Sequence, residues 1–174
     1  MGRMPLMLVA VLALPACTIL SSFQFRPLVE ATSGERARIR AIVTYGSLAV
    51  TPNKSCAAPS DPQSGMAIMR TPVGNPGFTG RSIGIPDDKI QYLDKADYAE
   101  FYATANAPIT FTLMDFGGRW HCVAPSIYFI PEANKDYEVE YIHDVRAGVC
   151  GVRVRSLPNR AVVMYSETGL CRRR

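Results

Sequence analysis

The chain has 174 residues, of which 48% are hydrophobic and 20% charged, so it is long and apolar enough to form one hydrophobic core. The formal net charge is +4, but Arg172, Arg173 and Arg174 stand together at the C-terminal end and Arg3 lies near the N-terminus. The rest of the chain is therefore close to neutral, which argues against a nucleic-acid-binding face and predicts no nucleic-acid partner.

The first seventeen residues have the layout of a secretory signal. Arg3 gives a positive head, residues 6–14 form an apolar run, and Leu14-Pro15-Ala16-Cys17 is a small-residue cleavage site that ends in cysteine. The apolar run is shorter than the about 20 residues that span a bilayer, which disfavours a transmembrane anchor. The other alternative is an ordinary secretory signal that leaves Cys17 as an unmodified thiol.

Residues 14–17 resemble the lipobox of bacterial lipoproteins, with Leu14 and Ala16 at the matching positions. The resemblance implies that residues 1–16 are a signal peptide and that the Cys17 thiol takes a diacylglyceryl group, followed by acylation (such as palmitate) of the new amine. Two or more acyl chains hold a protein stably at a membrane. Thr18 replaces the aspartate that retains many lipoproteins in the inner membrane, so we expect an outer-membrane protein facing the periplasm.

Four cysteines remain after Cys17 is assigned to lipid: Cys56, Cys122, Cys150 and Cys171. An even number in an oxidising compartment predicts two disulfides, with three possible pairings. The alternative is four reduced thiols, whereas zinc is disfavoured because no two of these cysteines have ligand spacing. We favour Cys122–Cys150, because both are expected near the open end of one strand hairpin, and this leaves Cys56 for Cys171. The other pairings stay open.

The first half of the mature chain combines strands with a long irregular segment. Residues 17–37 are expected to be the lipidated cysteine and a tether. Residues 38–45 and 48–51 are rich in β-branched residues and predict strands. Residues 57–86 are rich in proline and glycine and have no sustained period, which predicts a long ordered loop without a regular strand. A short helix is expected at 87–96, capped by Asp87.

The second half consists mostly of predicted strands, at residues 98–104, 109–114, 120–130, 137–143, 150–155 and 161–165. We expect a hairpin turn at 105–108, and a second hairpin through the turn at 131–136. Strict alternation places Tyr137, Val139 and Tyr141 on the inward face.

The fold class predicted is all-β, an antiparallel sandwich with one short helix. The sandwich domain is expected to span residues 38–171, followed by a basic tail at 172–174. That tail would either contact anionic lipid or lipopolysaccharide or remain solvated.

Catalytic and metal motifs are absent from the sequence: it contains no G-x-x-x-x-G-K, G-x-S-x-G or H-E-x-x-H. His121 precedes Cys122, but adjacent strand residues point to opposite faces. His143 precedes Asp144, at a strand end where a surface histidine is the simpler interpretation. The pair Asp87-Asp88 lacks the further oxygen ligands of a calcium loop. We therefore expect no enzyme, no metal and no cofactor.

Two groups of apolar or aromatic residues are candidates for binding. The first is a set of tyrosines that would form a carbohydrate- or protein-binding face or else lie in the core: Tyr92, Tyr98, Tyr102, Tyr128, Tyr137 and Tyr141. The second lies in or beside the long loop and would form a partner surface or fill the sandwich edge: Met66, Ile68, Met69, Val73, Phe78, Ile83 and Ile85.

The lipobox-like segment at residues 1–18 and the strand pattern over 38–166 together resemble small bacterial envelope lipoproteins that carry an immunoglobulin-like or transthyretin-like β-sandwich. The resemblance implies a lipid-anchored, non-enzymatic interaction or structural module that holds an envelope protein partner. The alternative function is a small hydrolase or carbohydrate-binding lipoprotein with a site under the 57–97 loop.

Overall fold

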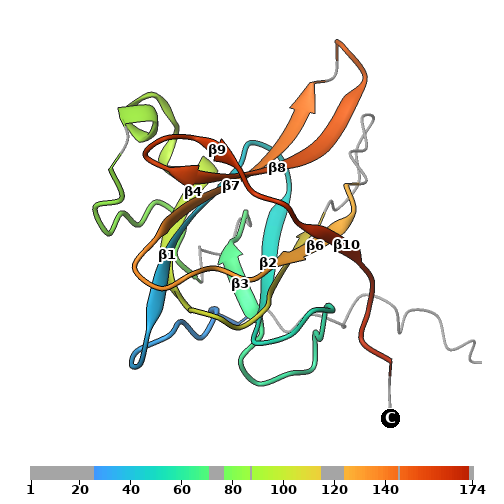
Figure 1. Cartoon of the computed structure of the whole chain (residues 1–174). Coiled ribbons are helices and arrows are strands. Elements are labelled where there is room, and N and C mark those ends of the chain that lie inside the picture. The colour runs from blue at the N-terminus through green and yellow to red at the C-terminus, as the bar shows by residue number, and fades with distance from the viewer. Residues whose placement is uncertain (1–25, 71–76, 87, 115–123, 145, 173–174) are drawn as a thin grey trace, which may run out of the picture.

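The computed structural model describes residues 26–70, 77–86, 88–114, 124–144 and 146–172. In this part of the chain, two five-stranded sheets pack face to face around one hydrophobic core (Figure 1). The predicted all-β sandwich is therefore confirmed.

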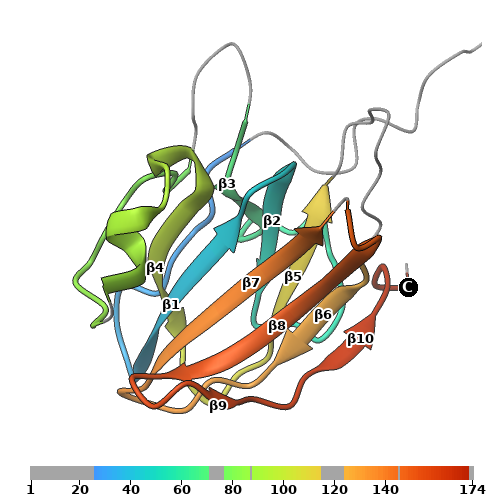
Figure 2. The same ribbon diagram turned by 90° about the horizontal axis from the view of Figure 1, so that it is seen from above.

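The first sheet has the strand order β4 (Tyr98–Thr104), β1 (Arg36–Val43), β7 (Asp136–Asp144), β8 (Val149–Leu157) and β9 (Ala161–Val162). The second sheet has the order β10 (Ser166–Thr168), β6 (Ser126–Phe129), β5 (Ile109–Met114), β2 (Ser47–Pro52) and β3 (Gly65–Ile68). Among the described strands, β1 and β7 are the parallel pair and the other pairings are antiparallel. Figure 2 shows both layers from above.

Side chains of the first sheet alternate between the core and an outer face. On β7, Tyr137, Val139 and Tyr141 are buried in the core as the sequence predicts. On β1, Ile39 packs in the same core, whereas Arg40 points to the opposite face because successive strand residues alternate. The alternation thus assigns one apolar and one charged face to this sheet.

The expected hairpin at 105–108 is wrong. Strand β4 pairs with β1 in the first sheet, whereas β5 pairs with β2 and β6 in the second. The connection crosses between the layers, and its Ala105 N–H donates to Glu35 O (2.9 Å) instead of across a hairpin. Because both strands bury one face in the same core, their patterns do not reveal that they lie in different sheets.

The expected hairpin through 131–136 is wrong for the same reason, since β6 lies in the second sheet and β7 in the first. The placement of Cys122 near Cys150 rested on this hairpin, so that reasoning fails. Cys150 itself is disulfide-bonded. Cys122 lies outside the described residues, and the Cys122–Cys150 pairing stays a prediction.

The long proline- and glycine-rich segment contributes strand β3, so the expectation of no regular strand there is wrong. All four residues of β3 are buried, and a short strand buried on both faces has no alternation to detect. Four of its apolar residues fill the sandwich edge, since Met66, Ile68 and Met69 are buried and Phe78 packs on the core. Ile85 is buried over the outer face of the first sheet, and Ile83 is half-buried. Val73 lies outside the described residues.

The expected helix at 87–96 is instead two short 3₁₀ helices, η1 (Asp88–Tyr92) and η2 (Lys95–Asp97). The Asp94 carboxylate accepts from the Ala96 N–H (2.9 Å) and starts η2. This local bond competes with a continuous helix, which explains the break. Asp87, the expected cap, lies outside the described residues.

Residues 26–28 lie beside β3. The Leu28 N–H donates to Met66 O (3.1 Å), and the Met66 N–H donates to Arg26 O (2.8 Å). A Cβ on Gly65 would stand 2.3 Å from Pro27 O, so only glycine permits this approach. The described part of the expected tether is therefore packed on the sandwich; residues 1–25 lie outside the described part.

The disulfide between Cys56 and Cys171 confirms one of the two expected pairings. It joins the segment after β2 to the C-terminal end. Backbone bonds support it, because the Ala57 N–H donates to Gly169 O (2.9 Å) and the Cys171 N–H donates to Ala57 O (2.9 Å).

Replacing both cysteines, Cys56→Ala with Cys171→Ala, should lower the free energy of unfolding by about 3–5 kcal/mol, since the bridge closes a long loop in the unfolded chain. The bonded residues are 115 positions apart. Urea denaturation without a reducing agent, which leaves the parent's disulfide intact, measures the change. The exposed neighbour Ser55→Ala is the control, and a double cysteine variant as stable as this control would contradict the prediction.

Tyr141 connects the two sheets through a buried hydrogen bond. Its hydroxyl on β7 donates to Phe111 O on β5 (3.2 Å). Burial raises the pKa of Tyr141 above its ordinary value, and the nearby Tyr165 adds to the shift. The folded state therefore keeps the neutral phenol to higher pH than the unfolded chain does.

The stability that this difference provides is fully present below the ordinary tyrosine pKa of about 10 and is lost as the pH rises above it, because only the unfolded chain then ionises. Tyr141→Phe should lower the free energy of unfolding by about 1 kcal/mol at neutral pH. It should also make the free energy of unfolding fall less steeply as the pH rises above about 10. Urea unfolding between pH 7 and pH 11 measures both effects. Tyr92→Phe, at an exposed position, is the control and should show the same fall in unfolding free energy with pH as the parent. An equally steep fall in Tyr141→Phe would contradict the assigned role of the buried Tyr141 phenol.

Candidate functional site

A segment that we call the strap, residues 78–86 and 88–97, lies along β4 and over the outer face of the first sheet (Figure 2). Its backbone continues the sheet at the β4 edge, where the Gly80 N–H donates to Tyr98 O (2.8 Å). Farther along, Ile85 O accepts from the Arg40 guanidinium (2.7 Å). The Ile83 N–H donates to the Glu100 carboxylate (2.7 Å).

Under the strap, three charged side chains lie in a row across three strands. Arg40 on β1 stands opposite Glu100 on β4 and opposite Glu138 on β7. Their exposed fractions are 0%, 0% and 1%, which is unusual for charged residues. Arg40 Nε lies 2.8 Å from Glu100 Oε1, and Arg40 Nη1 lies 4.0 Å from Glu138 Oε2.

Two further cations close this buried cluster. Lys89 from η1 lies 3.4 Å from Glu138 and 2.8 Å from Glu140. Arg160, just before β9, lies 3.3 Å from Glu138. The carboxylates of the cluster thus neutralise cations and hold the strap to the sheet, so the arrangement is structural.

Glu100→Ala should lower the free energy of unfolding by about 3–5 kcal/mol, because it leaves the Arg40 guanidinium buried without its closest carboxylate. The double variant Arg40→Met with Glu100→Leu should lose much less free energy of unfolding than the sum of the losses in Arg40→Met alone and Glu100→Leu alone. The reason is that the double variant leaves neither member of the pair buried without the other. Urea denaturation of the single and double variants measures the cycle.

Lys135→Ala is the control, because Lys135 forms an exposed ion pair with Glu132 (2.6 Å) and should change stability little. Additive losses in the double variant would contradict the assignment of the buried pair.

The described histidine, His143, does not meet a catalytic partner. Its ring lies 4.9 Å from the ring of Tyr45, centroid to centroid. Asp144 Oδ1 accepts from the N–H groups of Arg146 and Ala147 (3.0 Å each) and shapes the β7–β8 turn. Asp144 therefore serves the turn, and His143 is half-buried beside Tyr45 rather than fully exposed. His121 and Cys122 lie outside the described residues.

The tyrosines do not gather on one face. Tyr137 and Tyr141 are in the core, and Tyr98 is buried on the outer side of β4. The Arg36 guanidinium lies over the ring of Tyr102, 4.5 Å from the ring centroid. Tyr92, on η1, is 82% exposed. A single tyrosine-lined face is therefore wrong, and the core alternative holds for the β7 tyrosines.

A metal site is not formed by the described residues, since none of their histidine, cysteine, aspartate and glutamate side chains gather in a group of three or more able to hold an ion. Asp87 lies outside the described residues, as does the side chain of Asp88.

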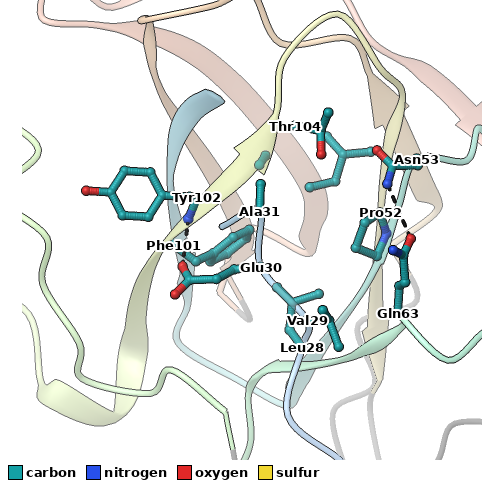
Figure 3. A pocket seen from close by; sticks show the side chains of 12 residues that line it. Leu28, Val29, Glu30, Ala31, Pro52, Asn53, Gln63, Phe101, Tyr102 and Thr104 are labelled. Atoms are coloured by element: carbon teal, nitrogen blue, oxygen red, sulfur yellow. Dashed lines mark hydrogen bonds between the residues drawn. The ribbon is translucent and has the colours of Figure 1, made fainter. Parts of the chain in front are cut away.

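Figure 3 shows a cavity between residues 28–31 and the ends of β4 and β2. Its polar groups are mutually bonded: the Tyr102 N–H donates to Glu30 (3.0 Å), and Asn53 donates to Gln63 (3.3 Å). Its volume is about 50 Å³, room for one or two waters and too small for a sugar ring. This cavity gives no support to a hydrolase or carbohydrate site.

A larger hollow of about 640 Å³ lies at one end of the first sheet, beside Arg38 and Tyr102. Asp136 accepts twice from Arg38, at 2.7 Å each, which raises the pKa of Arg38. Lys135 is paired with Glu132. Three charges that line this open hollow, those of Arg38, Asp136 and Lys135, are therefore already paired.

The side of the sandwich with β9 and β10 exposes apolar side chains. Residues 161–168 run from β9 to β10 along the outside of the molecule (Figure 2). Val163 and Tyr165 pack on the core, whereas Val162 and Met164 are 77% and 85% exposed. The sequence predicted a strand here but missed the exposed face, because the run 161–165 is apolar at nearly every position and does not show which residues point outward.

Comparison with protein families, with curated proteins and with solved structures found no match to this chain. In the described part of the chain, no helix has the length and apolar character that crossing a membrane requires.

Proposed function

We propose that this protein is a lipid-anchored lipoprotein of the bacterial outer membrane that faces the periplasm and binds an envelope protein without catalysing a reaction. The observation that carries the proposal is the contrast between two parts of the surface. Within the described residues, the carboxylate next to the catalytic candidate His143 is that of Asp144, and it accepts from two backbone N–H groups of a turn. The β9–β10 side instead exposes Val162 and Met164, which serve no purpose in the core.

The lipid anchor is proposed from the lipobox-like residues ending at Cys17. The chain from Cys17 to Arg26 can reach at most about 30 Å when fully extended. From Arg26 onward it is bonded beside β3, at one edge of the second sheet. The domain is thus held close to the membrane through its β3 side.

The β9–β10 side lies at the opposite edges of both sheets. Strand β9 is farthest from β4 in the first sheet, and β10 is farthest from β3 in the second. A domain tethered beside β3 therefore presents β9 and β10 away from its point of attachment. This orientation suits a module that holds a partner at a distance from the membrane surface.

The anchor is tested by Cys17→Ser, which removes the thiol that would carry the lipid. The variant should move from the membrane fraction to the soluble fraction or remain uncleaved, and the parent should incorporate labelled palmitate. Thr18→Ser, which keeps the cysteine, is the control and should remain in membranes. Processed Cys17→Ser protein that still partitions fully with membranes would refute the lipid anchor.

A further inference from the structure

The two sheet edges on the tether side are sealed by other parts of the chain. At the β4 edge, the Ala31 N–H donates to Tyr102 O (3.1 Å). At the β3 edge, the Phe78 N–H donates to Ala67 O (3.0 Å), and residues 26–28 bond to Met66. Covering an edge in this way prevents pairing with a strand of another chain.

The β9 edge is not sealed by any residue in the described ranges. The Val163 N–H donates to Val154 O (3.0 Å), and Ala161 stands opposite Ser156. In an antiparallel ladder, the residue between two hydrogen-bonded positions directs its N–H and C=O to the other side. The backbone groups of Val162 therefore point away from β8, toward open space.

The surface beside this edge is apolar and positively charged. Val162 stands opposite Arg155 across the β8–β9 ladder, on the outer face of the sheet. Arg153 and Arg160 lie close by, each sharing a carboxylate with Lys89: Glu140 for Arg153 and Glu138 for Arg160. Arg153 and Arg155 stand at alternate positions of β8, so two guanidinium groups lie on this outer face within reach of a strand added at β9.

We propose that β9 is a docking edge for an extended segment of an envelope protein in which acidic residues alternate with apolar ones. The partner strand would bond to the Val162 N–H and C=O, its apolar side chains would cover Val162 and Met164, and its carboxylates would meet the arginines. Strand addition of this kind obtains affinity from the backbone and specificity from alternate side chains. The inference rests on the proposed function, because it names the partner class for the same module.

Charge and orientation favour this occupant over two others. A second copy paired edge to edge would bring the arginines of both copies together, and like charges across an interface oppose association. A lipid surface would not satisfy the Val162 backbone groups, and the proposed tether holds the opposite side of the sandwich near the membrane. The acidic strand satisfies both the backbone and the arginines.

Val162→Pro is the decisive variant. Proline is tolerated at an edge whose N–H is unpaired, so the fold should remain intact while the donor to the partner strand is lost. Val163→Pro is the matched control, because it removes the bond to Val154 O and should lower the melting temperature sharply. Equal destabilisation by the two prolines would show that the Val162 N–H is already used and would overturn the proposal.

The probes are two ten-residue peptides, one alternating glutamate with valine and one alternating lysine with valine, added to the full chain carrying Cys17→Ser. Amide hydrogen exchange should show at least tenfold slower exchange at Val162 with the glutamate peptide and no change with the lysine peptide. Arg155→Glu should reduce the glutamate-peptide effect at least tenfold. No protection by the glutamate peptide, or equal protection by both, would overturn the proposal.

Two further measurements address the rival occupants. Binding of the same Cys17→Ser chain to phosphatidylglycerol vesicles, lost in Met164→Ser, would overturn the proposal in favour of a membrane surface. Dimerisation in sedimentation experiments, lost in Val162→Pro, would overturn it in favour of a second copy. All these experiments use the unlipidated chain, so failure of the lipid anchor and failure of the docking edge are distinguishable.

Discussion

The arrangement of the first sheet depends on the ion pair between Arg40 and Glu100. Removing two charges from water costs several kcal/mol for each, and this cost is offset only when the pair and its hydrogen bonds are in place. Because side chains alternate, a slip of β1 by one residue would drive Arg40 into the apolar core. The pair therefore restricts β1 and β4 to one register. The strap, which supplies Ile85 O and the Ile83 N–H, completes the same set of bonds.

The two sides of the sandwich use their sheet edges differently. The strap and the N-terminal segment occupy the edges of β4 and β3 with backbone bonds, so those edges are unavailable to other chains. On the far side, between β9 and β10, Val163 and Tyr165 pack on the core, whereas Val162 and Met164 are exposed. Within the described residues, one side of the domain is committed to its own stability, and the other exposes apolar side chains.

Local periodicity predicted the inward face of β7 correctly, because alternation is a property of neighbouring residues. It did not predict that β4 and β5 belong to different sheets, since each strand buries one face in a common core. The burial of Arg40 was also not predictable, because an arginine in a strand resembles any solvent-facing residue until Glu100 and the strap are brought to it. The Cys56–Cys171 pairing was predicted only because Cys122–Cys150 left these two cysteines over, so the correct result did not come from correct strand neighbours.

The Cys56–Cys171 bond has a mechanical consequence for a domain pulled between a membrane and a partner. With force applied at Arg26 and at Val162, the shortest covalent path runs from residue 26 to Cys56, crosses the sulfur atoms, and returns from Cys171 to residue 162. Residues 57–161 lie outside this path and bear no tension through the chain. The maximum extension of the tethered protein is therefore limited by two short segments, and most of the first sheet is shielded from the load.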